Sequence, residues 1–452
     1  MSNLLSKASL ILTPTSYGVG SVASVVPTDG SGDFSFERDS IATRVNESGL
    51  IEEVKSFSEE LIDYSTLTST STTFSQDVDG KWVYDDGGNG FLSMPSITAN
   101  VGDVFNVRVE MSLSGGGDSN FRITKGNAQT LLFNYTDFPD GVTEFQATVT
   151  GIDGFLDRIF FPASLNDVPN TLVSLSLKKL EEKNVPRINY ENGCGSWLFE
   201  PQSTNLYLNS ETLSTQTITT TANEYSVSFY GTGTITFSGT YTGSLIGTGL
   251  NDRVTATFTA TSGTLTSTIS GTVTKAQIEQ LSFATSYIPT DGSTVTRNQD
   301  VCTGSGSTSL IDSTEGVLYT EIARDSNDGF SGGVQINDGS VDNSLRLFFN
   351  QDDTISVITR VGGAANVVKT ARAITSSTAM NKFALVWKLN DYKLYYNGSV
   401  LWSDTSAPVY PVGTLNNLEL MNNSIPFNGT MKALAVWKEV LTDAELISLT
   451  TI

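Results

Sequence analysis

The sequence predicts an all-β chain built from tandem, jelly-roll-like β-sandwich modules. Apolar residues mostly alternate with polar ones, which is the period-two pattern of strands that bury one face. Gly-rich turns interrupt this alternation, and Thr and Ser dominate several of the strand-like stretches. At 452 residues the chain is too long for one hydrophobic core, so we expect about two to four domains.

Breaks in the alternation set the expected domain boundaries. Proline and glycine interrupt it around residues 186–201 and again at 284–300. The expected parts are an N-terminal anchoring arm (1–52), a β-sandwich (53–183), a connector (184–208), a small Thr-rich β-sandwich (209–284), a second connector (285–302) and a C-terminal β-sandwich (303–452).

The arm begins with a short apolar stretch, and the residues that follow, 34–50, cannot form a hydrophobic core of their own. We therefore expect the arm to pack on another part of the assembly. Residues 50–61 depart from the strand pattern, because their apolar spacing of three to four predicts a helix. In the sandwich that follows, the expected strands are 81–84, 104–109, 130–133, 145–149 and 172–177.

The two remaining sandwiches carry similar strand signals. Asn397-Gly398 predicts a two-residue hairpin turn of the primed type. Thr442 and Glu445 form a capping box, which predicts a helix over 443–449. The expected strands are 225–229, 234–237, 253–258 and 265–273 in the small module, and 316–322, 344–349, 354–359, 383–387, 392–396 and 399–402 in the C-terminal module.

Charge and hydropathy exclude several classes of partner. Acidic residues outnumber basic ones 48 to 26, and a net charge of −22 repels phosphate backbones, so we expect no nucleic-acid partner. No stretch approaches the roughly 20 apolar residues of a membrane span, so no membrane insertion is expected. The apolar run 8–13 lacks a small-residue cleavage site, so we expect no secretory signal and release by lysis.

Composition also argues against catalysis. The chain has no histidine, which removes the commonest general base and the usual zinc ligand. Cys194 and Cys302 lie far apart, and we expect both to be reduced and unpaired. A glucanase would need carboxylates about 5 Å apart on one strand, as in Glu-x-Asp-x-x-Glu, and that motif is absent. The acidic pairs at 85–86 and 352–353 are expected to be solvated loop charge, so we expect no enzyme.

The C-terminal 150 residues resemble a known superfamily. Phe383-x-x-x-Trp387, the run 392–398 ending in Asn-Gly, the run 428–437 ending in Val-Trp, and Leu-Thr-Asp-Ala-Glu-Leu at 441–446 carry the resemblance. They resemble the concanavalin A-like lectin/glucanase superfamily, in its laminin-G-like or pentraxin-like branch. The resemblance covers about residues 303–452 and implies a lectin-like sandwich.

Three other segments resemble virion and tail proteins of phages that infect Bacteroidota. They are residues 35–51, residues 186–206 and the joint 284–300, whose Pro-Thr-Asp-Gly turn is repeated at 27–30. The resemblance implies an appended structural or adhesive protein: a tail fibre, head fibre or capsid decoration. Such proteins are commonly trimeric and carry modules like carbohydrate-binding domains, which is how we interpret residues 53–183. No long fibrous segment is present, so a fibre shaft is not expected.

Four residues are candidates for glycan binding. The rings of Trp82, Tyr84 and Trp402 would stack on sugars if they were exposed, although large aromatic residues in strands are usually core residues. Trp402 follows the predicted hairpin and precedes Asp404, so these two residues form the preferred candidate pair.

Two Gly-containing loops place several oxygen donors close together, an arrangement that calcium accepts. The candidate ligands are Asp77 and Asp79 in one loop, and Asp325, Asn327 and Asp328 in the other. The same residues are also typical of ordinary turns that bind no metal. Calcium is the one cofactor that the sequence suggests.

Together these observations predict a bacteriophage virion structural protein, attached to capsid or tail, that exposes lectin-like modules for host adhesion. Residues 1–50 are expected to contact other virion proteins, and surface glycans are expected partners. The thin Thr-rich module would gain stability from packing against neighbours, which favours a homotrimer. The alternatives are a dedicated glycan-binding receptor-binding protein and a polysaccharide-degrading enzyme.

Overall fold

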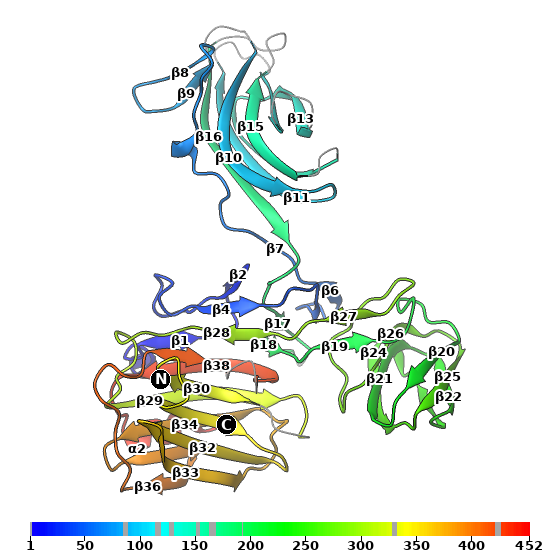
Figure 1. Ribbon diagram of the computed structural model, residues 1–452, viewed down its shortest axis with the longest axis vertical. Helices are drawn as coiled ribbons and strands as arrows, with labels where there is room; N and C mark the ends of the chain where they lie inside the picture. The colour runs from blue at the N-terminus through cyan, green and yellow to red at the C-terminus, as the bar shows by residue number, and fades with distance from the viewer. Residues whose placement is uncertain are drawn as a thin grey trace. The chain divides into compact units, whose positions relative to one another are not determined.

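A computed structural model describes residues 2–84, 89–113, 119–125, 131–150, 154–161, 169–191, 193–327, 332–420 and 426–452. The chain is almost entirely β-structure, which confirms the prediction of tandem β-sandwich modules (Figure 1). It divides into two compact units: the inserted unit, Lys55–Glu181, and the main unit, Met1–Val54 with Glu182–Ile452. In the described ranges, no helix is long and apolar enough to cross a membrane.

The inserted unit is a sandwich of two antiparallel sheets, with strand orders β14-β11-β16-β9-β8 and β10-β15-β12-β13; β7 extends the first sheet by pairing with β16. In β11, Phe105 and Val107 are fully buried while Asn106 between them is partly exposed, so the period-two pattern does build the core. The bounds are β7 Ser56–Phe57, β8 Phe74–Gln76, β9 Trp82–Tyr84, β10 Gly90–Ala99, β11 Val104–Leu113, β12 Ser119–Thr124, β13 Leu131–Phe138, β14 Gly141–Thr148, β15 Gly154–Phe161 and β16 Asn170–Glu181, with a 3-10 turn at Tyr64–Thr66.

The predicted helix over residues 50–61 is wrong. Those residues form β6 (Ile51–Glu53), which pairs with β5 (Thr43–Val45), and β7, which pairs with β16. Arg44 and Glu52 lie opposite each other across β5 and β6 and form a 2.8 Å ion pair. A hairpin with the preceding strand β5 and pairing with the distant strand β16 therefore overrode the local apolar spacing.

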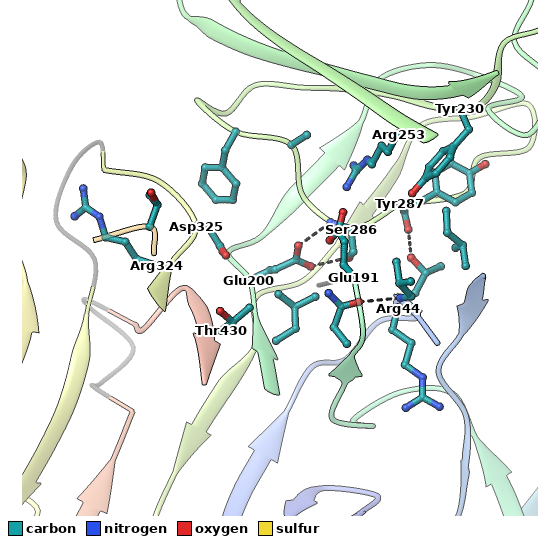
Figure 2. A pocket seen from close by; sticks show the side chains of 18 residues that line it. Arg44, Glu191, Glu200, Tyr230, Arg253, Ser286, Tyr287, Arg324, Asp325 and Thr430 are labelled. Carbon is teal, nitrogen blue, oxygen red and sulfur yellow. Dashed lines mark hydrogen bonds between the residues drawn. The ribbon is translucent and has the colours of Figure 1, made fainter. Parts of the chain in front are cut away.

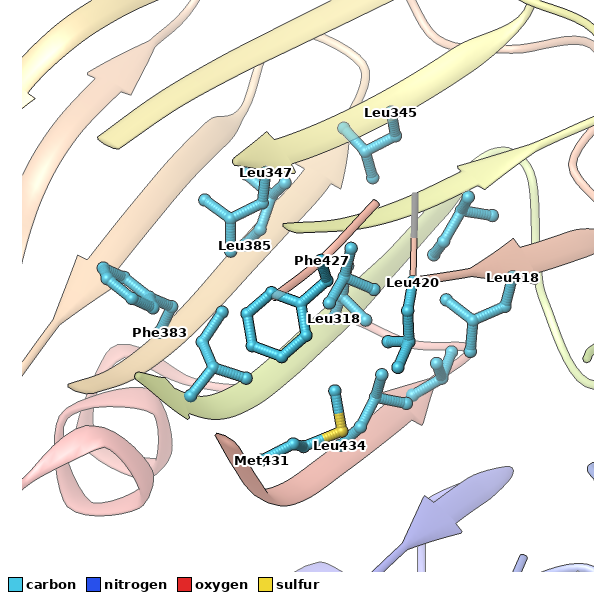
Figure 3. Packing of buried hydrophobic residues seen from close by; sticks show 14 of the residues in the cluster. Leu318, Leu345, Leu347, Phe383, Leu385, Leu418, Leu420, Phe427, Met431 and Leu434 are labelled. Carbon is cyan, nitrogen blue, oxygen red and sulfur yellow. The ribbon is translucent and has the colours of Figure 1, made fainter. Parts of the chain in front are cut away.

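The C-terminal sandwich of the main unit packs an eight-stranded sheet, β17-β18-β38-β29-β34-β35-β36 with β1 on β38, against the five-stranded sheet β33-β32-β31-β30-β37. Leucine and phenylalanine side chains from both sheets fill the space between them (Figure 3). The bounds are β17 Ile188–Asn189, β18 Ser196–Phe199, β29 Glu315–Arg324, β30 Gly333–Asn337, β31 Ser344–Phe349, β32 Thr354–Val361, β33 Ala364–Ala373, β34 Asn381–Lys388, β35 Tyr392–Tyr396, β36 Ser399–Asp404, β37 Asn417–Glu419 and β38 Gly429–Trp437.

Two local predictions in this sandwich are confirmed. Asn397 and Gly398 both have positive φ, 44° and 85°, as a primed hairpin turn between β35 and β36 requires. The C-terminal helix α2 (Asp443–Thr450) begins at a complete capping box, in which Thr442 and Glu445 each satisfy the other's backbone N–H.

The N-terminal segment packs on the C-terminal sandwich of its own chain. After a short helix α1 (Ser2–Leu5), strand β1 (Leu10–Leu12) pairs with β38, and both Leu10 and Leu12 are fully buried. Next come β2 (Tyr17–Gly18), β3 (Ser21–Val22) and β4 (Phe34–Glu37), which form one sheet with β28 (Val301–Thr303). The segment expected to be a coreless arm thus contributes to a core built largely by residues after 300.

The small module has two sheets, β20-β25-β22-β23 and β24-β21-β26. Its core is compact and rich in aromatic residues; for example, the rings of Tyr241 and Phe258 stack with centroids 4.2 Å apart. The bounds are β20 Gln216–Thr220, β21 Glu224–Gly231, β22 Thr234–Gly239, β23 Gly243–Ile246, β24 Gly249–Thr259, β25 Gly263–Ser270 and β26 Thr274–Glu279; the flanking connectors pair as β19 (Ser203–Asn205) with β27 (Val295–Arg297).

Candidate functional site

A buried ion cluster lies where the connectors of the main unit meet. Its five members are at most 3% exposed, and each is at the end of a short strand: Arg38 after β4, Arg187 before β17, Glu200 after β18, Arg297 at the end of β27 and Asp300 before β28. Pairing of β4 with β28 brings Arg38 and Asp300 together, although they are 262 positions apart in the chain.

Asp300 and Glu200 are the acceptors of the cluster. Arg38 Nη1 lies 2.9 Å from Asp300 Oδ1, and Arg187 Nη2 donates to Asp300 Oδ2. The other terminal nitrogen of Arg187, Nη1, lies 2.6 Å from Glu200 Oε2. Arg297 Nη2 approaches the same Glu200 oxygen at 3.4 Å, so each carboxylate contacts more than one guanidinium.

Backbone and hydroxyl groups complete the coordination of Glu200. The N–H and Oγ of Ser286 donate to its two carboxylate oxygens, each at 2.7 Å. Its own N–H donates to Asp300 Oδ2 at 2.8 Å. Because Ser286 belongs to the second connector, Glu200 joins both connectors in one network.

The cluster shifts the pKa values of its members in opposite directions. Burial would raise the pKa of Glu200 and Asp300, but the adjacent guanidiniums outweigh it and hold both below their ordinary values. Burial opposes the charge of Arg187, yet Asp300 and Glu200 raise its pKa. For Arg38 burial dominates over the attraction of Asp300 and lowers the pKa to about 10. Glu200, Asp300, Arg187 and Arg38 therefore stay charged near neutral pH.

The cluster was not predicted from the sequence, but its members come from residues 35–51, 186–206 and 284–300, the three segments singled out in the sequence analysis. Arg38 lies in the first segment, Arg187 and Glu200 in the second, and Arg297 and Asp300 at the end of the third. The signal that could have revealed it is an arginine flanked by short apolar strands in each segment. The sequence alone does not say that the three arginines share two acids.

A cavity of about 240 Å³ lies beside the cluster (Figure 2). Glu200, Ser286 and Arg253 line it together with Asp325, whose side chain points toward Glu200. Oδ2 of Asp325 is buried and has no hydrogen-bond partner among the residues that the structure describes. Burial, followed by the Glu200 charge, raises the pKa of Asp325 well above its ordinary value.

A lowered and a raised carboxyl pKa facing one cavity is the pattern of an acid–base pair in hydrolases. Here, however, both oxygens of Glu200 accept hydrogen bonds from Ser286, and one of them is also paired with Arg187. Both carboxylate oxygens of Glu200 are therefore used in contacts that join the connectors. The cavity has a polar lining in which Glu200 and Asp325 are not arranged as an acid and a nucleophile.

The four glycan-binding candidates have other contacts in the structure. Tyr84 is fully buried and stacks on Phe161 at 5.6 Å, and Trp82 is only 8% exposed. Trp402 is 7% exposed within the C-terminal core, and Asp404 forms a 3.3 Å ion pair with Lys369 that joins β36 to β33. The three rings are therefore core residues, which is the usual place of large aromatic residues in strands, because the inward positions of these strands take them.

The calcium candidates do not converge. Asp77 Oδ1 accepts hydrogen bonds from the N–H groups of Asp79 and Lys81, which makes the loop an ordinary turn. Asp325 faces Glu200, whereas Asn327 is exposed and hydrogen-bonds with Asp353; Asp328 lies outside the described residues. Across the described ranges, no three His, Cys, Asp or Glu side chains are grouped to hold a metal. Both cysteines are free, as expected.

Comparison with known proteins gives structural matches only. No family model matches the sequence, and no curated protein does. The carbohydrate-binding module CBM40 of the Ruminococcus gnavus IT-sialidase, solved with α2,3-sialyllactose, matches with a TM-score of 0.28 and 19% identity over 33% of this chain and 94% of its own. Domain 4 of the Geobacillus stearothermophilus arabinanase AbnA matches with a TM-score of 0.29 and 15% identity over 34% of this chain and 73% of its own.

A third match is the leech intramolecular trans-sialidase, with a TM-score of 0.27 and 20% identity over 33% of this chain and 26% of that enzyme. Each similarity thus concerns about a third of the present chain. At these identities and TM-scores, the matches identify neither an activity nor a ligand for it.

Proposed function

We propose that the chain is a structural component of a bacteriophage particle, an appendage or decoration on capsid or tail that displays β-sandwich modules to the host surface. The observation that supports this most is the ion cluster. The three segments that resemble phage virion proteins are the segments that it joins.

The physical basis is rigidity. A flexible linker between modules would be polar and solvated, whereas here the charged side chains at the ends of the connectors are buried and joined by charged hydrogen bonds. Removing Arg187 would leave each of its two buried carboxylates with one guanidinium fewer, which destabilises the joint. A display protein benefits from such a joint, because the two connectors stay together.

Contacts with other virion proteins through residues 1–50 would use the exposed side of that segment. Its inward residues, such as Leu10 and Leu12, are occupied by the core of the C-terminal sandwich. Its outward apolar residues include Leu5, Ile41 and Leu50, which are 45%, 41% and 56% exposed. We expect these three to contribute to the attachment surface, and a homotrimer to be the displayed form.

Purified phage particles test this proposal. Mass spectrometry and a cryo-EM map of particles encoded by the same genome should show the chain at the capsid or tail surface in a fixed number of copies. Particles that lack the chain, although the infected cell produces it, would contradict the proposal. A charge substitution such as Leu50→Glu should lower its incorporation into particles while leaving its thermal unfolding unchanged.

A further inference from the structure

We propose that the cavity beside the ion cluster binds a single neutral sugar residue at the end of a surface glycan. This inference rests on the host-facing role proposed above and gives that role a ligand and a site. The cavity measures about 240 Å³. Pockets for drug-sized ligands measure about 300–1,000 Å³, so this one suits a smaller molecule such as one sugar ring. Glu191 and Thr378 line the cavity and are exposed, so it opens to solvent on their side.

Two parts of the main unit supply polar groups to the cavity. Tyr230 of β21 and Arg253 of β24 lie opposite each other in the small module, so their side chains share one face of that sheet. Asp325 directly follows β29 in the C-terminal sandwich. Figure 2 shows Tyr230 and Arg253 on one side of the cavity and Asp325 on the other. A molecule held in the cavity can therefore contact both parts at once.

Several polar groups of the lining have no partner in the described part of the chain. The buried Oδ2 of Asp325 is one of them. The Tyr230 hydroxyl, Asn189 Nδ2 and Arg253 Nη1 likewise have no hydrogen bond within the described ranges. The other ends of two of these side chains are bonded: Asn189 Oδ1 accepts a hydrogen bond and Arg253 Nη2 donates one. Because buried polar groups nearly always have partners, the cavity is expected to hold molecules that supply them.

The mixture of donors and acceptors favours a hydroxylated ligand. Arg253 and the Nδ2 of Asn189 can only donate, the Tyr230 hydroxyl can donate and accept, and Asp325 supplies an acceptor. The hydroxyls of a sugar ring also donate and accept, while its faces carry C–H groups. Phe283 and Tyr230 line the cavity and offer aromatic surface to such C–H groups. One sugar ring thus matches both the polar and the aromatic parts of the lining.

The charges of the lining favour a neutral ligand over a charged one. Three arginines and three acidic residues line the cavity, and they are Arg44, Arg253, Arg324, Glu191, Glu200 and Asp325. Their formal charges sum to zero, or to +1 when Asp325 carries the proton that its raised pKa favours. A cation is therefore not attracted. An anion would lose its hydration for the attraction of at most one net charge, whereas a neutral sugar loses no ionic hydration.

Ligand-observed NMR titration of the full-length chain tests the proposal. We would titrate the methyl glycosides of glucose, galactose, mannose, N-acetylglucosamine and fucose. Methyl glucuronide serves as the anionic comparator and glucosamine as the cationic one. At least one neutral glycoside should bind, and it should bind more tightly than either charged sugar. Added salt should change this binding little, because no ion pair between protein and ligand is screened.

Substitutions in the lining test the site itself. Asp325→Ala should weaken the binding about tenfold, because it removes the buried acceptor. Asp325→Asn keeps an acceptor without a charge, so it should change the dissociation constant about threefold or less. Tyr230→Phe removes only the hydroxyl and should also weaken the binding; it serves as a second variant if Asp325→Ala unfolds. The matched controls Asp404→Ala and Tyr395→Phe remove the same groups from the C-terminal sandwich away from the cavity lining, and they should leave the binding unchanged.

Three results would overturn the proposal. The first is that no neutral glycoside binds, in which case ordered water satisfies the lining. The second is that a charged sugar binds more tightly, or that Asp325→Asn abolishes the binding, since either would mean that charge selects the ligand. The third is that Asp404→Ala and Tyr395→Phe weaken the binding as much as the substitutions in the lining do. The presence of the chain in particles is measured separately, so either proposal can fail alone.

Discussion

Arg187 is the centre of the ion cluster, and Arg187→Met is the substitution that tests it most directly. The variant keeps much of the side-chain volume but leaves Glu200 and Asp300 with fewer partners. Removing one partner of a buried ion pair typically costs about 3–5 kcal/mol. Asp300 keeps Arg38 at 2.9 Å and Glu200 keeps Arg297 at 3.4 Å, so we expect the lower end, about 3 kcal/mol.

Urea unfolding followed by tryptophan fluorescence measures this loss. Four of the five tryptophans, Trp197, Trp387, Trp402 and Trp437, lie in the main unit, so the signal reports mainly on the unit that holds the cluster. The matched control is Lys183→Met, which removes a 2.8 Å pair with Asp39 whose side chains are 56% and 71% exposed. Exposed pairs contribute little, so the control should unfold nearly as the wild type does.

The pH dependence provides a second readout. Because Glu200 and Asp300 have lowered pKa values in the folded chain, the unfolded chain binds protons first as the pH falls. The contribution of these two carboxylates to the free energy of unfolding is thus complete above a pH of about 4 and is lost as the pH falls below it. Arg187→Met should make this acid-dependent loss shallower. If Arg187→Met destabilises no more than Lys183→Met, the cluster does not hold the connectors and the reasoning fails.

Three further outcomes are expected. Burial and the Glu200 charge raise the pKa of Asp325, so the folded chain keeps a proton that the unfolded chain releases, and Asp325 lowers the free energy of unfolding as the pH rises above about 4. The variant Asp325→Asn should therefore become more stable relative to wild type from pH 4 to 7. A difference in urea midpoints that does not change with pH would contradict this. Leu10→Ala should lower the free energy of unfolding in urea by about 2–5 kcal/mol, because Leu10 is fully buried. Leu250→Ala, at a 64% exposed position, should lower it little. Equal effects would mean that β1 is not part of the core. Thr442→Ala should cost about 1 kcal/mol by removing the cap of α2, and a midpoint equal to that of wild type would argue against the cap.

The sequence was most informative where a short pattern decides a local structure. Asn397-Gly398 adopts the predicted primed turn because only such residues readily take positive φ at both central positions. Thr442 and Glu445 form the predicted capping box because their partners are only three residues apart. Alternation of apolar residues likewise placed strands such as β11 and β34.

The features that depend on distant partners were not predictable. Residues 50–61 have helical spacing, yet Ser56 and Phe57 among them pair with residues 180–181 of β16. Leu10 and Leu12 belong to a core formed mostly by residues after 300, which no local pattern reveals. The ion cluster is the extreme case, since Arg38 and Asp300 meet across 262 positions.

The arrangement of the cluster also bears on how such chains diversify. All five of its residues lie outside Lys55–Glu181. The cluster thus has members before and after the inserted unit in the sequence but none within it. The stretch between Val54 and Glu182 can then be lost, duplicated or replaced by recombination while the charges that hold the connectors stay matched. Substitutions within the inserted unit and substitutions within the ion cluster would therefore fall in separate parts of the gene.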